Sequence, residues 1–153
     1  IDEGVGKMRA AVAARKDAGL VIAGRTSAPG MTSIADAIAR AKAYEKTGVD
    51  AIFLVGVKSR ADLDTIAGEV KLPLILGGAG KEIMDRAYLA SRGVRICLQG
   101  HQPIMAAVQA IHDTLKALRE GVPPERLERV ANDETMKRVT RNADYARWSK
   151  DFL

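Results

Sequence analysis

The sequence predicts an α/β protein with parallel strands, specifically part of a TIM-type (β/α)₈ barrel. Short apolar runs alternate with helical segments about four times along the chain. No two-residue hairpin turn joins one run to the next, so the strands are expected to be parallel with right-handed crossovers. An open doubly wound sheet would also fit, but residues 23–28 (Ala-Gly-Arg-Thr-Ser-Ala) lack the glycine fingerprint of a dinucleotide fold. A barrel is therefore preferred, and this chain would supply about four of its βα units.

Each element has its own sequence signal. Helical segments carry apolar residues three or four positions apart and end at a glycine, whereas buried parallel strands are continuous apolar runs. Helices are predicted over residues 2–18, from the cap Ser33 through residue 47, after the cap Ser59, and over 81–92 and 103–119. Strands are predicted over residues 20–23, 49–57, 72–76 and 94–98, with a loop at Pro29 and Gly30.

Two regions are expected. Residues 1–121 would form the barrel part, and residues 122–153 a helical extension that follows Pro123 and Pro124. Apolar aromatic residues near a chain end usually pack on protein, so Tyr145, Trp148 and Phe152 should dock onto the barrel or a neighbouring subunit. Because the chain starts without methionine inside a helical pattern, we expect that a segment lies upstream.

Composition excludes several classes of protein. With 47% hydrophobic residues among 153, the chain can form a real core. Its one cysteine, Cys97, cannot form an intramolecular disulfide, which predicts a cytoplasmic location, and no apolar run is long enough for a membrane span. The net charge of +5 comes largely from a tail that mixes both signs, and only 4% of residues are aromatic, so nucleic acid is not expected as a partner.

Ligands of parallel α/β folds bind at the carboxyl ends of the strands, and the first strand ends at Arg25, Thr26 and Ser27. A guanidinium here can bind a carboxylate or phosphate through two parallel hydrogen bonds. An ion pair with a neighbouring acid is the alternative.

Two further strand ends offer candidates. The loop Gly77–Gly80, including Gly78, could present backbone N–H groups to an anion or be a loop without a ligand, and it lacks the ending of a P-loop. Gln99 and His101 follow the last strand, where a neutral imidazole could exchange a proton near pH 7 or serve only as a cap or surface residue. No metal-ligand spacing occurs at any strand end.

Two segments resemble a known family. Residues 20–28 (Leu-Val-Ile-Ala-Gly-Arg-Thr-Ser-Ala) and 35–53 (Ala-Asp-Ala-Ile-Ala-Arg-Ala-Lys-Ala-Tyr-Glu-Lys-Thr-Gly-Val-Asp-Ala-Ile-Phe) resemble the fifth and sixth βα segments of the phosphoenolpyruvate mutase/isocitrate lyase superfamily. The likeness continues through residues 71–75 and 93–95. It implies that residues 1–121 are the C-terminal half of the (β/α)₈ barrel and supply about its last four βα units. Members of that family have an arginine-threonine strand end whose arginine binds the substrate carboxylate, which implies this role for Arg25 and a place in the substrate site for Thr26.

The resemblance implies a Mg²⁺-dependent lyase that acts on 2-oxo or 2-hydroxy di- and tricarboxylates through an enolate, in a homodimer or homotetramer whose eighth helices are exchanged. Its metal ligands lie on the second to fourth strands, so we expect Mg²⁺ to be held by the N-terminal half of the barrel, a required partner, and none of its ligands to lie in this chain. Residues 98–101 (Leu-Gln-Gly-His) resemble the oxaloacetate decarboxylase branch, which implies that Gln99 and His101 lie near the substrate.

Three hypotheses about function remain open. The first is an oxaloacetate decarboxylase-like C–C lyase, with Arg25 holding a carboxylate and His101 beside the enolate. The second is a 2-methylisocitrate lyase or a phosphonomutase of the same superfamily. The third is an inactive fragment or interaction module, because half a barrel exposes two sheet edges.

Overall fold

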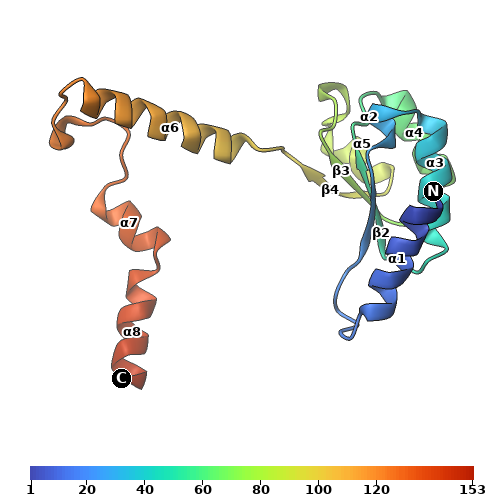
Figure 1. Cartoon of the computed structure of the whole chain (residues 1–153), viewed down its shortest axis with the longest axis horizontal. Helices are drawn as coiled ribbons and strands as arrows, with labels where there is room; N and C mark the ends of the chain where they lie inside the picture. Colours follow the sequence, from blue (N-terminus) through green and yellow to red (C-terminus); the bar gives the residue numbers. More distant parts are fainter. The chain divides into compact units, whose positions relative to one another are not determined.

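A sheet of four parallel strands organises the first part of the chain (Figure 1). The computed structural model describes residues 1–153, which divide into two units, Ile1–Gly100 and His101–Leu153. The strands are β1 (Ala23–Thr26), β2 (Ala51–Val55), β3 (Leu74–Gly77) and β4 (Val94–Leu98), in the order β1-β2-β3-β4. Helices connect successive strands, so the predicted parallel α/β architecture is confirmed.

The helices are mostly where their sequence signals place them. In the first unit they are α1 (Asp2–Ala14), α2 (Ala28–Met31), α3 (Ile34–Glu45), α4 (Arg60–Glu69), the 3₁₀ turn η1 (Lys81–Ile83) and α5 (Arg86–Ser91). The hydroxyl oxygens of Ser33 and Ser59 accept hydrogen bonds from backbone N–H groups in the first turns of α3 and α4, each over 3.1 Å. Both predicted N-caps are therefore confirmed.

One face of the sheet is buried beneath helices. Ile52 and Leu54 of β2 pair in register with Leu74 and Leu76 of β3, and all of these side chains are fully buried. Residues of α3, α4 and α5 complete this core, and α1 adds partly buried side chains. This layer of helices holds the strands in place, so that the strand ends form a fixed edge.

The other face of the sheet carries no covering helix from the first unit. We call it the open face and define it by Arg25, Phe53, Ile75 and Ile96, which pair in register across the strands. Phe53 and Ile75 are half-buried, and Ile96 is 50% exposed. The sheet thus presents an apolar surface with one cation on β1.

The first helix and strand differ from their predicted bounds. The helix ends at Ala14 rather than at residue 18, because Arg15 turns away to Asp50, where Nη1 lies 2.7 Å from Oδ2. The strand predicted over residues 20–23 occupies Ala23–Thr26 instead. Pairing with the β2 segment begins at Ile22, whose carbonyl accepts a hydrogen bond from the Asp50 N–H over 2.8 Å. Leu20 and Val21 are apolar but lie before this first pairing and are exposed.

Two other predictions are corrected. Pro29 and Gly30 lie within the short helix α2 rather than in a loop, since proline is tolerated in the first turn of a helix. The helix predicted over residues 81–92 is divided into η1 and α5, because the Asp85 carboxylate accepts a hydrogen bond from the Tyr88 N–H over 2.6 Å and caps a new helix. Strand β4 occupies the predicted residues 94–98.

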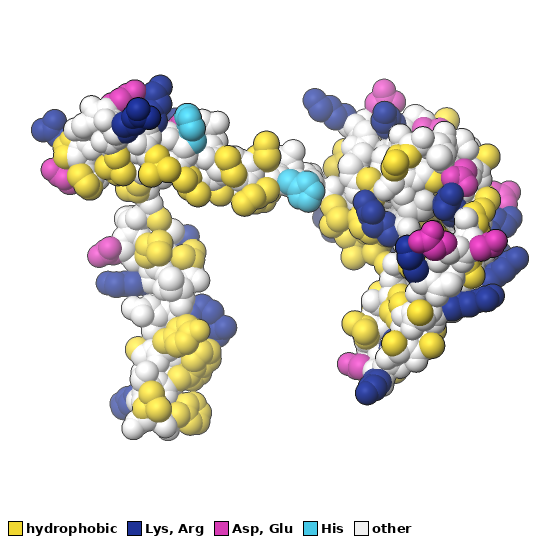
Figure 2. All heavy atoms as spheres, viewed as in Figure 1, with side chains coloured by type: hydrophobic (Ala, Val, Ile, Leu, Met, Phe, Trp, Pro, Cys, Tyr) yellow, Lys and Arg dark blue, Asp and Glu magenta, His cyan; other side chains and the backbone are white.

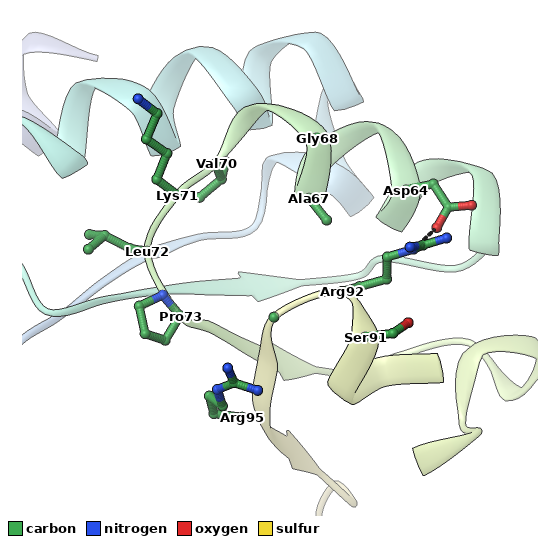
Figure 3. Close-up of a pocket in the computed structure, with 11 residues that line it drawn as sticks. Asp64, Ala67, Gly68, Val70, Lys71, Leu72, Pro73, Ser91, Arg92 and Arg95 are labelled. Atoms are coloured by element: carbon green, nitrogen blue, oxygen red, sulfur yellow. Dashed lines mark hydrogen bonds and ion pairs between the residues drawn. The ribbon is translucent and has the colours of Figure 1, made fainter. Parts of the chain in front are cut away.

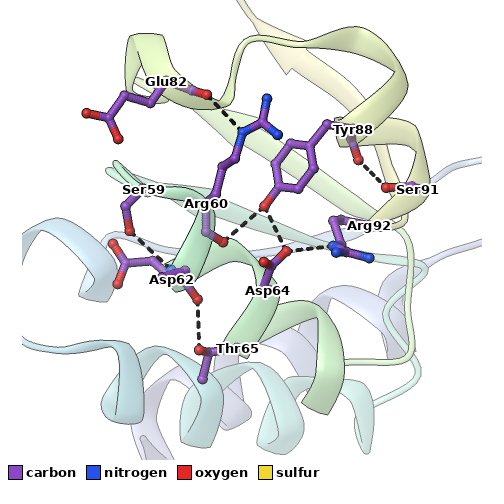
Figure 4. Close-up of polar contacts among 10 residues, drawn as sticks. Ser59, Arg60, Asp62, Asp64, Thr65, Glu82, Tyr88, Ser91 and Arg92 are labelled. Carbon is purple, nitrogen blue, oxygen red and sulfur yellow. Dashed lines mark hydrogen bonds and ion pairs between the residues drawn. The ribbon is translucent and has the colours of Figure 1, made fainter.

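A polar cluster fastens α4 to α5 on the outside of the sheet (Figure 4). The Asp64 carboxylate accepts hydrogen bonds from Arg92 over 2.6 Å and from the Tyr88 hydroxyl over 2.8 Å. The Arg60 guanidinium lies 4.3 Å from the centroid of the Tyr88 ring. The hydrogen bond from Arg92, with that from Tyr88, lowers the pKa of Asp64, so the carboxylate is ionised and paired.

The second unit consists of α6 (Gln102–Arg119), η2 (Pro124–Arg126), α7 (Asp133–Val139) and α8 (Asn142–Phe152), which confirms helices after Pro123 and Pro124. Figure 2 shows apolar side chains on the surface of this unit. Those of α6 include Ile104, Met105, Val108, Ile111 and Leu115. Within α8 the rings of Tyr145 and Trp148 pack edge to face with centroids 5.3 Å apart.

The domain boundary expected at residue 121 and the docking of the aromatic tail stay predictions. None of the helices is both long enough and apolar enough to cross a membrane.

Candidate functional site

The carboxyl ends of the four strands lie at one edge of the sheet, which we call the rim together with the loops that follow. Parallel pairing places Thr26 beside Leu54, Val55 beside Gly77, and Gly77 beside Leu98. The loops also contact each other, since Gly80 N–H donates to the Val57 carbonyl over 3.0 Å. Residues distant in sequence therefore meet at this edge.

Arg25 lies one residue before the end of β1, on the open face. Its guanidinium carbon lies 5.7 Å from the centroid of the Phe53 ring on β2, its partner in register. The side chain is exposed and forms no ion pair with an acid of this chain. Both N–H edges of the guanidinium are therefore available for an anionic ligand.

Thr26 faces away from Arg25. It is 8% exposed, and its hydroxyl oxygen accepts a hydrogen bond from the Ala28 N–H over 3.1 Å, at the start of α2. Adjacent residues of a strand point to opposite faces, so the side chains of Arg25 and Thr26 leave the strand in opposite directions. The hydroxyl of Thr26 holds the turn after β1, and its predicted contact with substrate stays a prediction.

The glycine-rich loop is anchored at its end. Gly80 packs against the Lys58 carbonyl, where there is no space for a Cβ. Gly78 is exposed, with a φ of +60°, and a Cβ on it would meet only Val55, at 3.9 Å. The loop thus presents Gly78 at the rim, while the Gly80 N–H is engaged with Val57.

Gln99 and His101 follow β4 on either side of the boundary between the two units. Gln99 belongs to the first unit and is exposed. His101 begins the second unit, occupies the N-cap position of α6 and makes no capping hydrogen bond with its side chain. Its ring is thus not engaged at the helix start, and the predicted role of His101 in catalysis stays a prediction.

Phe53 is a site residue that the sequence reasoning missed. Its place beside Arg25 depends on the register between β1 and β2, which pairs position 25 with position 53, and no local sequence signal gives that register. Cys97, by contrast, lies inside β4 with its sulfur 3.8 Å from that of Met84. Burial raises the pKa of this thiol, which disfavours a reactive thiolate.

The first unit also contains a pocket, at the end of the sheet opposite the rim (Figure 3). It has a volume of about 570 Å³ and is lined at the amino ends of β3 and β4 by residues that include Pro73, Gly93 and Arg95. Figure 3 shows Arg92 directed toward Asp64 and Lys71 directed away from both, so the basic groups do not converge on one point. The rim is therefore the better candidate site.

No group of three or more His, Cys, Asp or Glu side chains could hold a metal ion in this chain. The residues present thus do not form a magnesium site by themselves, and the chemistry of this chain must be derived from Arg25 and its neighbours.

Comparison with known proteins identifies the family. Residues 1–119 match the family described as phosphoenolpyruvate phosphomutase. The chain belongs to this family. The match includes the whole sheet and α6, so the resemblance of residues 20–28 and 35–53 to the phosphoenolpyruvate mutase/isocitrate lyase superfamily is confirmed.

Curated proteins that the chain matches include oxaloacetate decarboxylases. The chain is 54% identical over 153 residues to the oxaloacetate decarboxylase of Bradyrhizobium sp. strain ORS 278, covering 100% of this chain and 53% of that protein. It is 52% identical over 153 residues to the oxaloacetate decarboxylase of Rhodopseudomonas palustris strain BisB18, of which it also covers 53%. The chain spans about half the length of the curated relatives it matches.

Solved structures of the superfamily have the same fold. Phosphonopyruvate hydrolase, in complex with oxalate and Mg²⁺, matches 99% of this chain and 56% of its own, with a TM-score of 0.80 and 25% identity. The structure of 2,3-dimethylmalate lyase matches 98% of this chain and 54% of its own, with a TM-score of 0.82 and 24% identity. This second match is evidence for the fold alone. Because such barrels match over about half their length, the predicted partial barrel is confirmed.

Proposed function

We propose that this chain is the C-terminal half of an oxaloacetate decarboxylase-like lyase. The observation that carries the proposal is the 54% identity to an oxaloacetate decarboxylase over the whole chain. The unpaired Arg25 at the rim adds physical support, because a carboxylate substrate needs a cation that no acid of the protein neutralises.

Arg25 would act by binding and orienting the substrate. One edge of its guanidinium can hold one carboxylate of oxaloacetate through two parallel hydrogen bonds, which fixes the second carboxylate relative to the C2 carbonyl. In decarboxylation the C3–C4 bond breaks, CO₂ leaves and the electron pair forms an enolate, which gains a proton at C3 to give pyruvate. His101 is proposed as the polar or acid/base neighbour of this enolate, and Gln99, Gly78 and Thr26 as further substrate contacts.

Magnesium belongs to the proposal as a cofactor of the complete barrel. The structure of phosphonopyruvate hydrolase holds oxalate and Mg²⁺, and this chain resembles that fold at 25% identity. Since no acidic cluster for a metal exists here, we propose that the ligands are supplied by the other half of the barrel. No step assigned to this chain depends on them.

An assay of the completed barrel, meaning this chain together with the N-terminal half of its barrel, tests the proposal. The enzyme with Mg²⁺ is offered oxaloacetate, 2-methylisocitrate and phosphonopyruvate in parallel, and product formation is measured for each. We expect turnover of oxaloacetate. Turnover of one of the other substrates alone would instead assign a 2-methylisocitrate lyase or a phosphonomutase, and turnover of none would favour an inactive fragment or interaction module.

The chain should need partners. Strands β1 and β4 are the sheet edges, and the open face carries apolar side chains, so we propose that the N-terminal barrel half covers them in the cytoplasm. The exposed apolar residues of α6 support the proposal that this helix is exchanged within a homodimer or homotetramer. Intact-mass analysis would detect a bound N-terminal segment, and light scattering would give the number of subunits.

A further inference from the structure

The guanidinium of Arg25 lies beside the aromatic ring of Phe53. The guanidinium carbon lies 5.7 Å from the ring centroid, within the range of a cation–π contact. No ion pair restrains the guanidinium. A long side chain without an ion pair would sample several rotamers. Contact with the Phe53 ring limits the orientations that the Arg25 guanidinium can adopt.

Gly77 on β3 makes room for that ring. A Cβ built on Gly77 would lie 2.9 Å from Cε2 and 3.1 Å from Cζ of Phe53, closer than real Cβ contacts allow. The φ of Gly77 is not in the left-handed region, so space rather than backbone conformation requires glycine here. The ring therefore leans over β3 toward the rim, since Gly77 is the last residue of its strand.

These contacts form a row across three strands, from Gly77 to Phe53 to Arg25. We infer that Phe53 is a positioning residue, which presents its ring face to the guanidinium and leaves both N–H edges free for a substrate carboxylate. Gly77 in turn sets the position of the ring. The inference rests on the proposed function, because it assumes that Arg25 binds a carboxylate.

Binding of oxalate tests the inference without requiring turnover. The probe is oxalate with Mg²⁺, titrated by calorimetry into the completed barrel. Loss of the cation–π contact in Phe53→Leu should weaken oxalate binding roughly 3- to 30-fold. Phe53→Tyr keeps the ring and should bind within about 2-fold of the unchanged protein. Ile96→Leu, on the same face but on β4, two strands away from Phe53, is the matched control and should also bind normally.

The Phe53→Leu substitution made in a protein that already carries Arg25→Lys separates positioning of the guanidinium from general packing. In Arg25→Lys the fork-shaped guanidinium is absent, so adding Phe53→Leu should weaken oxalate binding by less than about 2-fold. Equal losses in both backgrounds would overturn the inference, as would unchanged binding in Phe53→Leu alone. If Phe53→Leu does not fold, Phe53→Met replaces it, since methionine fills irregular space without a ring.

The outcomes also distinguish this inference from the decarboxylase proposal. Oxalate binding that depends on Arg25 and Phe53, with no turnover of oxaloacetate, would support the positioning role and remove the proposed activity. Turnover of oxaloacetate, with oxalate binding that Phe53→Leu does not change, would support the decarboxylase activity and remove the positioning role of Phe53. Absence of oxalate binding to the unchanged enzyme would overturn the inference directly.

Discussion

Gly30 and Gly56 touch backbone to backbone at the rim. A Cβ built on Gly56 would lie 2.9 Å from the Cα of Gly30 and 3.1 Å from its nitrogen. The φ of Gly56 is +90°, which side-chain-bearing residues rarely adopt. Helix α2 and the end of β2 thus lie so close that no side chain fits between Gly30 and Gly56, and this contact shapes the rim.

Replacing Gly56 with alanine should therefore lower stability. Backbone strain and the contact with Gly30 together should reduce the free energy of unfolding by roughly 2–3 kcal/mol, measured by urea denaturation. Gly93→Ala is the control, because its φ is +75° but a Cβ there would meet nothing within 4 Å. A loss in Gly56→Ala no larger than in this control would show that the contact with Gly30 is unimportant.

Two glycines of α1 form a matched pair. A Cβ on Gly4 would overlap the Tyr44 hydroxyl, whereas a Cβ on Gly6 would meet nothing within 4 Å. Gly6→Ala should raise the free energy of unfolding by about 0.5–1 kcal/mol, because alanine loses less conformational entropy in a helix. Gly4→Ala should lower it or gain nothing. Equal gains from both substitutions, measured by thermal or urea unfolding, would contradict this.

Arg25→Lys should sharply lower the activity of the completed enzyme. One ammonium cannot replace a guanidinium that holds a carboxylate through two hydrogen bonds, and we expect kcat/KM to fall by about 10-fold or more. Arg95→Lys is the control, since Arg95 also forms no ion pair but lines the pocket at the opposite end of the sheet. Near-normal turnover in Arg25→Lys would count against its assigned role.

Asp50 should make stability depend on acid pH. The hydrogen bond from the Ile22 N–H, with help from Arg15, holds the pKa of this carboxyl below its ordinary value. A carboxyl whose pKa is lower in the folded chain than in the unfolded chain stabilises the fold above its unfolded pKa, about 4, and this contribution is lost as pH falls through the folded pKa.

Asp50→Asn should thus be less stable than the unchanged chain at neutral pH, because asparagine lacks the charge that pairs with Arg15. The difference should shrink as pH falls, and it can be followed by urea denaturation down to the lowest pH at which the chain folds. A difference that stays constant across this range would show that ionisation of Asp50 does not contribute.

Local signals predicted much of the fold. Ser33 and Ser59 were predictable as caps because capping involves only residues within one helical turn. The bounds of β1 were not, since the ladder begins where Asp50 and Ala51 pair with Ile22 and Ala23, and this depends on a strand elsewhere in the sequence. An apolar run alone does not say which of its residues enter the sheet.

The candidate site was predictable only in part. Parallel topology placed Arg25 at the rim, but the ring beside it required the register between β1 and β2. The opposite direction of Thr26 follows from the alternation of side chains along a strand, so it could have been predicted from the sequence. The position of Gly77 against Phe53 depends on three-dimensional packing and had no sequence signal.

The strand order β1-β2-β3-β4 has a consequence for how the chain acquires its fold. Each strand pairs only with the preceding and the following strand, so every step of sheet growth closes a short loop rather than a long one. Short loop closures favour rapid folding. During synthesis β1 and β2 can join as soon as residue 55 has emerged, and each later βα unit can then add to a sheet that already exists.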